Sequence, residues 1–156
     1  AATAATEHLA AIFAGWMFRH PEALQGAEPR LQTLWLWHAS EEAEHCSTAF
    51  DVYKALGGSE QWRLRLMNYI TWTFAMDIAR QTIRNLWHDG SLFKWATWRS
   101  AYALLFAKDG MVRGNAAEWR AYKAPSFHPR QQDTSLSEQW LRDNQAQYSI
   151  VGRAAG

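Results

Sequence analysis

Helical spacing of apolar residues runs through almost every long segment of this chain, and this periodicity constrains the fold more than any other feature. No segment alternates convincingly between apolar and polar residues with period two, the pattern of a half-buried strand. Residues that end or begin helices separate the periodic segments, notably Pro21, Pro29, Gly57, Gly58 and Gly90. The sequence therefore predicts an all-α protein.

Capping residues mark where the individual helices begin. Ser59 and Ser91 can each cap the helix that follows, and Ser135 with Glu138 forms a capping-box pattern for a last helix. In chain order, the predicted helices cover residues 3–18, 29–56, 60–89, 92–107, 111–122 and a final segment from about residue 135.

The composition fits one domain, or part of one. With 156 residues, 48% of them hydrophobic, the chain is long enough to bury a core. A net charge of +1 gives no electrostatic reason to expect a nucleic-acid partner. The single Cys46 rules out an internal disulfide and fits a reducing compartment, and no basic segment precedes the apolar stretch 9–18 as it would in a secretory signal. We therefore expect a cytoplasmic location.

Three segments differ in character. Residues 1–58 form a ligand-bearing helix pair, 59–124 an apolar, Trp-rich hairpin with a short helix, and 125–156 a loop with the C-terminal helix. The stretches 64–79 and 92–107 are strongly apolar, but charged residues interrupt each before a full membrane span is reached. Burial in a bundle core is the favoured expectation for this hairpin. Its Trp, Tyr and Arg content also suits a peripheral membrane contact or a contact with a membrane protein.

Four potential metal ligands interrupt the apolar stripe of the second predicted helix. The offsets from His38 are 3 residues to Glu41, 4 to Glu42 and 7 to His45. A helix therefore places these four side chains on one face. Leucines precede them and apolar residues follow at the same spacing, which predicts that this face is buried. Because an unpaired buried charge is costly, the cluster implies ion pairs, water or a metal.

Glu42 and His45 form an E-x-x-H motif, whose spacing lets a carboxylate and an imidazole reach one ion. Glu7, on the preceding helix and flanked by alanines, is the candidate for a third ligand. The predicted metal set is therefore Glu7, Glu42 and His45. The alternative is that Glu41, Glu42 and Glu44 are ordinary solvated charges with weak contacts to the histidines, since E-x-x-H also occurs by chance.

Four segments together carry a resemblance to a known family: ATEHLAAIFA (5–14), LWLWHASEEAEH (34–45), AFDVYKALGG (49–58) and SFHP (126–129). They resemble the bacterial family labelled predicted metal-dependent hydrolases. The resemblance implies a ferritin-like helical bundle, or its C-terminal half, with Glu7, Glu42 and His45 as metal ligands. It also implies that His38 and Glu41 are further ligands or their neighbours.

Two departures from the family pattern bear on the site. Family members usually carry a further N-terminal helical half with its own E-x-x-H helix, which has no counterpart here, and Cys46 stands where Lys is common. One copy offers too few ligands for a closed dinuclear site. We therefore expect either a missing N-terminal half or a homo-oligomer, such as a symmetric dimer that combines two copies of the ligand set.

Three functions remain open on this evidence. The first is a hydrolase in which a divalent ion (iron, manganese or zinc, and as many as two ions) lowers the pKa of water, with Glu41 or His38 relaying a proton to an unknown small-molecule substrate. The second is a dinuclear iron oxidase or oxygenase, because carboxylate-rich sites also support redox chemistry. The third is a non-catalytic, Trp-rich subunit of a larger, membrane-associated assembly.

The remaining candidates have a structural alternative of equal or greater weight. Asp51 can orient a ligand histidine, and an ordinary surface position is equally expected. Cys46 is expected to be a small buried residue. Structural roles are favoured for the other histidines, which are His8, His20, His88 and His128.

Overall fold

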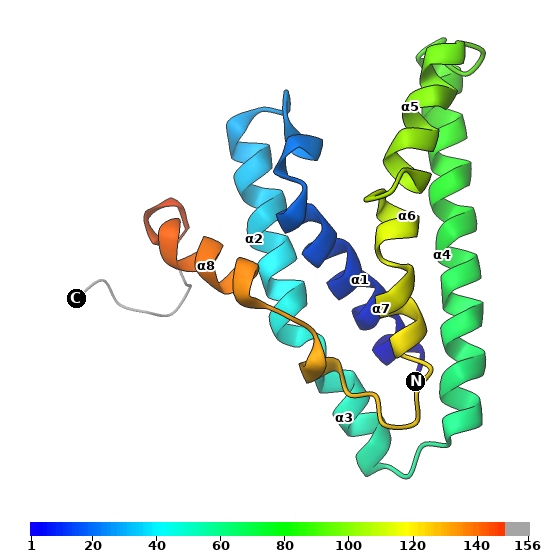
Figure 1. The fold of residues 1–156 in the computed structure, drawn as a ribbon, viewed down its shortest axis with the longest axis vertical. Helices are drawn as coiled ribbons and strands as arrows, with labels where there is room; N and C mark the ends of the chain where they lie inside the picture. Colours follow the sequence, from blue (N-terminus) through cyan, green and yellow to red (C-terminus); the bar gives the residue numbers. More distant parts are fainter. Residues whose placement is uncertain (149–156) are drawn as a thin grey trace.

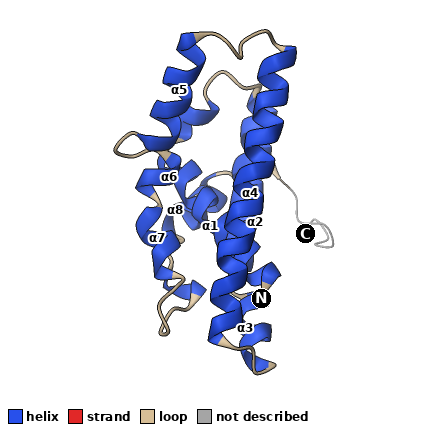
Figure 2. Ribbon diagram, turned by 90° about the vertical axis from the view of Figure 1, so that its right-hand side faces the viewer, coloured by secondary structure: helices blue, strands red, loops and turns tan. Residues whose placement is uncertain are grey.

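The computed structural model describes residues 1–148, and this part of the chain contains α-helices and short 3₁₀ turns but no strand. The all-α prediction is confirmed. Figure 1 shows the helices in an elongated arrangement, with α1 between α2 and α4, and Figure 2 shows the same helices from the side. The last predicted segment beyond residue 148 lies outside the described residues.

The first two helices form an antiparallel hairpin. α1 (Ala2–Arg19) ends before the 3₁₀ turn η1 (Pro21–Leu24), and α2 (Pro29–His45) returns alongside it. Both helices bury small residues, which are Ala4, Ala5 and Ala14 of α1 and Ala39 and Ser40 of α2. Such residues let two helix backbones approach closely, so they determine which face of α2 turns inward.

The second predicted helix is divided into two in the structure. α2 ends at His45, and α3 (Thr48–Ala55) begins after a break at Cys46 and Ser47. In an uninterrupted helix the N–H of Ala49 would bond to the carbonyl of His45. It donates instead to Oε2 of Glu7 at 3.2 Å. The prediction of one helix over 29–56 is therefore wrong, because a side chain of α1 binds a backbone group at the start of α3.

The long helix α4 (Glu60–His88) matches its prediction, including the cap, because the Ser59 hydroxyl accepts a hydrogen bond from Trp62 N–H. The next helix, α5 (Trp95–Phe106), begins four residues after Ser91, so Ser91 is not its cap. The predicted helix over 111–122 is divided at Asn115. Its parts are α6 (Met111–Gly114) and α7 (Ala116–Ala121).

The hydrophobic core lies between α1, α3, α4 and the segment after α7, and consists of Ala4, Ala5, Leu9, Phe50, Met67, Tyr122 and Phe127. Arg63 is buried in this core. Its guanidinium lies over the Tyr122 ring, 4.8 Å from the centroid, and donates to the carbonyls of Tyr122 and Ala124. Glu60 Oε2 lies 2.6 Å from its Nη2. The buried charge therefore has a carboxylate, two carbonyls and a π face as partners.

The outer face of the Trp-rich hairpin is exposed. Tyr69 and Trp72 of α4 are 61% and 65% exposed, whereas Met67, two residues and about 200° away from Tyr69, is buried. The prediction that bundle packing would bury this hairpin is wrong, because only one face of α4 contacts α1. Among residues 1–148, no helix combines the length and apolar character that crossing a bilayer requires.

The C-terminal part of the described chain packs back on the first hairpin. After the 3₁₀ turn η2 (Pro129–Gln131), α8 (Ser135–Asp143) contacts α2 and α1, and the turn η3 (Gln145–Gln147) follows. Thr134 precedes the first helical residue, and its hydroxyl bonds to Glu138 Oε1 at 2.8 Å. The helix predicted from Ser135 is confirmed, with the cap one residue earlier than expected.

Candidate functional site

The His and Glu face of α2 points to solvent rather than to the core. Ser40 is fully buried, and His38 lies two residues before it, about 200° around the helix, whereas Glu42 lies at the edge of the buried side with its side chain 30% exposed. The His38 side chain is 53% exposed, and Leu31 and Leu34 on the same face are also exposed. The prediction that this face is buried is wrong, because the small residues on the opposite side of α2 pack against α1.

The structure brings two of the predicted site residues together. Nε2 of His38 lies 3.6 Å from Oε1 of Glu42, one helical turn further on, and the His38 ring meets the Trp35 ring edge-on at a centroid distance of 6.2 Å. Glu41 is half-buried, and His45 is exposed at the end of α2.

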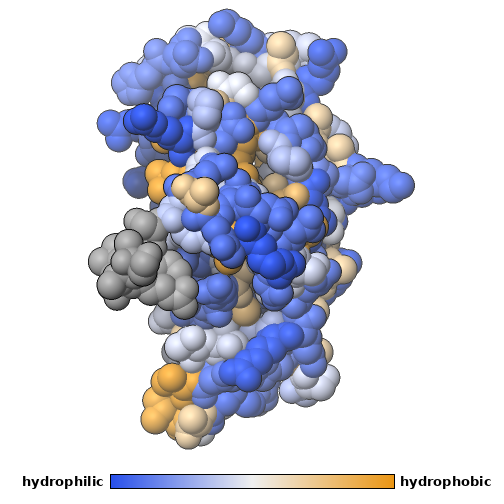
Figure 3. Space-filling view, turned by 90° about the vertical axis from the view of Figure 1, so that its left-hand side faces the viewer, coloured by the Kyte–Doolittle hydropathy of each residue, from blue (hydrophilic) through white to orange (hydrophobic). Residues whose placement is uncertain are grey.

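Figure 3 views the side of the molecule that carries α2 and α8, where apolar patches interrupt a mainly hydrophilic surface.

Glu7 occupies a different environment from Glu42 and His45. Its carboxylate accepts the Ala49 N–H at the start of α3, beside Cys46. Burial raises the pKa of the Cys46 thiol, and the Glu7 carboxylate raises it further. Glu7 therefore serves as a remote N-terminal cap of α3, a role that its position in the sequence did not indicate.

A polar network joins α3 to the loop that precedes α8. Oδ1 of Asp51 lies 2.8 Å from Nε2 of His128, and Oδ2 lies 3.4 Å from Nη2 of Arg130. Nε of Arg130 also contacts the Ser47 hydroxyl at 3.5 Å. Asp51 does orient a histidine, but that histidine is His128 and not one on α2. The sequence contained one signal for this pair. The AFDVY segment, which contains Asp51, and the SFHP segment, which contains His128, both resemble segments of the same family.

His8 forms a second polar network inside the molecule. Its ring is fully buried, tilted against Tyr122, with Nε2 3.3 Å from the carbonyl oxygen of Glu118 and Nδ1 3.4 Å from Nε2 of Gln132. Burial lowers the pKa of His8 to about 4; the hydrogen bond to Glu118 opposes this shift and the Arg63 charge adds to it. The structural role expected for His8 agrees with this geometry. Burial also raises the pKa of Tyr122 to about 12.

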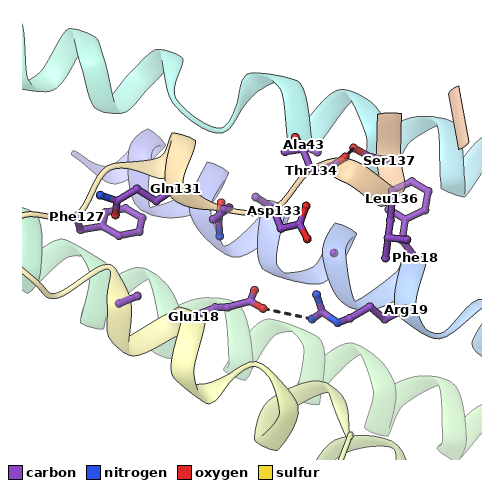
Figure 4. A pocket seen from close by; sticks show the side chains of 14 residues that line it. Phe18, Arg19, Ala43, Glu118, Phe127, Gln131, Asp133, Thr134, Leu136 and Ser137 are labelled. Atoms are coloured by element: carbon purple, nitrogen blue, oxygen red, sulfur yellow. Dashed lines mark hydrogen bonds and ion pairs between the residues drawn. The ribbon is translucent and has the colours of Figure 1, made fainter. Parts of the chain in front are cut away.

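A cavity of about 250 Å³ lies beside this network. It is bounded by α1, by Ala43 of α2, by α7 and by the segment that leads into α8 (Figure 4). Side chains of both kinds line it: apolar Phe18, Phe127 and Leu136, and charged Arg19, Glu118 and Asp133 are among them.

The fold and these clusters define an all-helical protein with carboxylate and imidazole side chains on one outward helix face. The chain belongs to the family described as predicted metal-dependent hydrolase, whose profile matches residues 1–133. No curated protein and no solved structure matches the chain.

The family description implies a divalent metal, and the described residues of a single copy do not supply a complete site for one. Within residues 1–148, no group of three or more His, Cys, Asp or Glu side chains has the geometry to hold a metal ion. The nearest approach is the His38–Glu42 pair, which supplies two donors. Structural metal sites use four ligands, and catalytic ones normally use three from the protein.

Proposed function

We propose that this protein is a metal-dependent hydrolase whose metal site is completed by a second copy of the chain. The observation that carries the proposal is the His38–Glu42 pair, with 3.6 Å between Nε2 and Oε1, on an exposed face of α2. His45 extends this donor set by one turn. Two copies of the face would supply the carboxylates and imidazoles that one copy lacks.

The surroundings of the pair support a symmetric contact. Leu31 and Leu34, 48% and 54% exposed, lie on the same face and offer apolar area to an identical surface. Glu41 and Glu42 would bring like charges together in such a contact, so a cation between the two copies would favour it. Glu7 takes no part in this contact, because it binds the start of α3.

His38 and Glu41 have the chemistry for proton transfer at this face. An imidazole is a common general acid or base, and a neighbouring carboxylate can orient it. Glu42 lies beside His38 in this way. Glu41, half-buried on the same side of α2, is the second proton-transfer candidate.

The test measures metal content and mass together, on protein purified without chelator. We expect a divalent metal and a dimer by elemental analysis and light scattering, with both lost in Glu42→Gln and in His38→Gln. Leu34→Glu should give a metal-free monomer. Glu44→Gln is the matched control, since Glu44 is exposed on the same helix but off the stripe. Stoichiometric metal in a monomer, or unchanged metal in the His38 and Glu42 variants, contradicts the proposal.

The identity of the metal separates hydrolysis from oxygen chemistry. Hydrolytic activity with zinc, which has no redox chemistry, supports the hydrolase. Bound iron with an optical signal that changes on exposure to oxygen supports a dinuclear oxidase or oxygenase instead.

A second candidate function is that of a non-catalytic subunit that binds a membrane surface. Exposed Trp62, Tyr69, Trp72 and Trp87 follow the outer side of α4. Together, α4, α5 and the connection between them carry five exposed basic residues against two exposed acidic ones. Aromatic side chains with basic residues suit the interface of an anionic bilayer. The five basic residues are Arg65, Arg80, Arg84, Lys94 and Arg99; the two acidic ones are Asp77 and Asp89.

Vesicle sedimentation tests this candidate. The protein should sediment with phosphatidylglycerol vesicles and not with phosphatidylcholine vesicles, Tyr69→Ser with Trp72→Ser should abolish binding, and Glu42→Gln should not affect it. A protein that stays in the supernatant with both vesicle types rejects the candidate.

A further inference from the structure

The connection between α4 and α5 forms an apolar tip, which comprises residues 87–95. Phe93 is 86% exposed, the highest value among the large apolar side chains that the structure describes, and Trp95 is 79% exposed. The Phe93 ring meets the ring of Trp87 edge-on, with 6.2 Å between the centroids. Figure 1 places the tip at one end of the elongated molecule and α3 at the other. The tip therefore projects from the fold with its aromatic rings in contact with solvent.

The backbone of the tip is held by hydrogen bonds within the tip and its two helices. The N–H groups of residues 89–92 donate to carbonyl oxygens in the last turn of α4. The carbonyl of Leu92 accepts the indole N–H of Trp98 at 2.7 Å, and the carbonyl of Ser91 accepts the hydroxyl of Thr97 at 3.0 Å. Backbone groups that already have partners can leave water at little cost, which an apolar medium requires. This arrangement suits a turn that enters a lipid interface.

Basic side chains surround the aromatic ones. Arg84, Lys94 and Arg99 are exposed and lie within the tip or about one helical turn from it. Asp89 is the one acidic residue between positions 84 and 99, and its carboxylate accepts the hydroxyl of Ser91. The tip therefore carries an excess of positive charge, which is complementary to an anionic lipid surface.

The opposite end of the molecule shows that apolar exposure alone does not give this combination. Leu56, just after α3, is 83% exposed, nearly as much as Phe93. The nearest basic residue in the sequence, Lys54, has its Nζ 2.5 Å from Oε1 of Glu60. This end therefore lacks the aromatic rings of the tip, and its nearby positive charge is paired.

We propose that the tip inserts into the interface of an anionic bilayer, with Phe93 and Trp95 below the lipid phosphates and the surrounding basic side chains bound to these phosphates. Lys and Arg can extend to the phosphates while their alkyl parts lie among the lipid chains. The inference rests on the membrane contact proposed above as the second candidate function, and it adds which end of the protein enters the lipid. Trp87 joins the tip to the exposed aromatic residues of α4, so the helix meets the membrane obliquely and the tip lies deepest.

The first test places an environment-sensitive fluorophore at the tip of the full chain. Cys46→Ala gives a background without other thiols, and nitrobenzoxadiazole (NBD) is attached in the Phe93→Cys variant. With phosphatidylglycerol vesicles, we expect the NBD emission to increase and shift to the blue, and to be quenched by lipids with a doxyl group on the acyl chain. NBD attached in Glu44→Cys, at an exposed position of α2, should show neither change.

The second test compares the two ends of the molecule by vesicle sedimentation. Phe93→Ser with Trp95→Ser should weaken binding to phosphatidylglycerol vesicles roughly tenfold or more, because two aromatic side chains no longer leave water. Val52→Ser with Leu56→Ser is the matched control, since it removes two apolar side chains that are 55% and 83% exposed at the other end. This control should bind like the parent, and equal losses in the two double variants would overturn the proposal.

The outcomes separate this proposal from the membrane contact on which it rests. If the parent sediments with the vesicles while NBD at position 93 stays in water, the insertion is overturned and the membrane contact stands. If the parent does not sediment, both are rejected. A lower mass of the vesicle-free protein in Phe93→Ser with Trp95→Ser would place these rings in a contact between proteins, and would also overturn the insertion.

Discussion

Two polar clusters of this protein have opposite surroundings. The inner one, around His8 and Arg63, is buried, and each of these two side chains has hydrogen-bond partners from another segment. In the outer one, His38 is exposed and Glu42 is half-buried, and each has the other, one helical turn away, as its charged partner. The difference teaches that a helix can bury polar side chains where another segment provides complementary groups, and that α2 has no such segment on its outer side within the described chain.

The largest expected effect comes from the inner cluster. Arg63→Ala removes the partner of Glu60 and of two backbone carbonyls, and should lower the free energy of unfolding by about 3–5 kcal/mol. Urea denaturation measures this change. Arg65→Ala, an exposed arginine on the same helix, should stay within about 0.5 kcal/mol of the parent. Similar losses of unfolding free energy in the two variants would contradict the difference between the buried and the exposed arginine.

The second effect is the pH dependence of His8. Its pKa is about 4 in the folded protein and 6.5 as a free group, so the unfolded chain binds the proton first as the pH falls. Stability should therefore decrease from pH 6.5 to 4, by about 3 kcal/mol from this residue. Urea denaturation at pH 7.5 and 4.5 checks this, with His8→Gln as the reference that lacks the titration. If the unfolding free energy of parent and variant changed equally between the two pH values, His8 would not be held neutral in the folded protein.

A smaller effect is expected for Glu7. Glu7→Ala removes the acceptor for the Ala49 N–H and should lower the free energy of unfolding by about 1 kcal/mol, as loss of a helix cap does. Glu7→Gln retains an acceptor oxygen and should restore most of the stability. Loss of bound metal in Glu7→Gln without loss of stability would instead make Glu7 a ligand, as the sequence predicted.

The outer cluster should contribute least to stability. Glu42→Gln removes an exposed contact with His38 and should change the free energy of unfolding of metal-free protein by less than about 0.5 kcal/mol. Thermal unfolding after treatment with a chelator measures it. A change of several kcal/mol would mean that this face is buried in solution, for example by a second copy.

Much of the helical organisation follows from local signals. Ser59 caps α4 where it was expected, and the prolines and glycines separate the helices as predicted. The break between α2 and α3 had no local signal, because it depends on the Glu7 carboxylate, 42 positions away from Ala49. The His128–Asp51 pair and the cavity depend on similarly distant contacts.

The sequence by itself determined that the chain is helical, where most helices lie, which family it belongs to and that His38, Glu41, Glu42 and His45 share a face. These properties depend on residue types and spacing within one segment. Only the tertiary structure decided which side of α2 turns inward. Both sides of this helix carry apolar or small residues, and the choice depends on how closely Ala39 and Ser40 fit against α1. That fit between distant segments turned the metal-ligating face toward solvent.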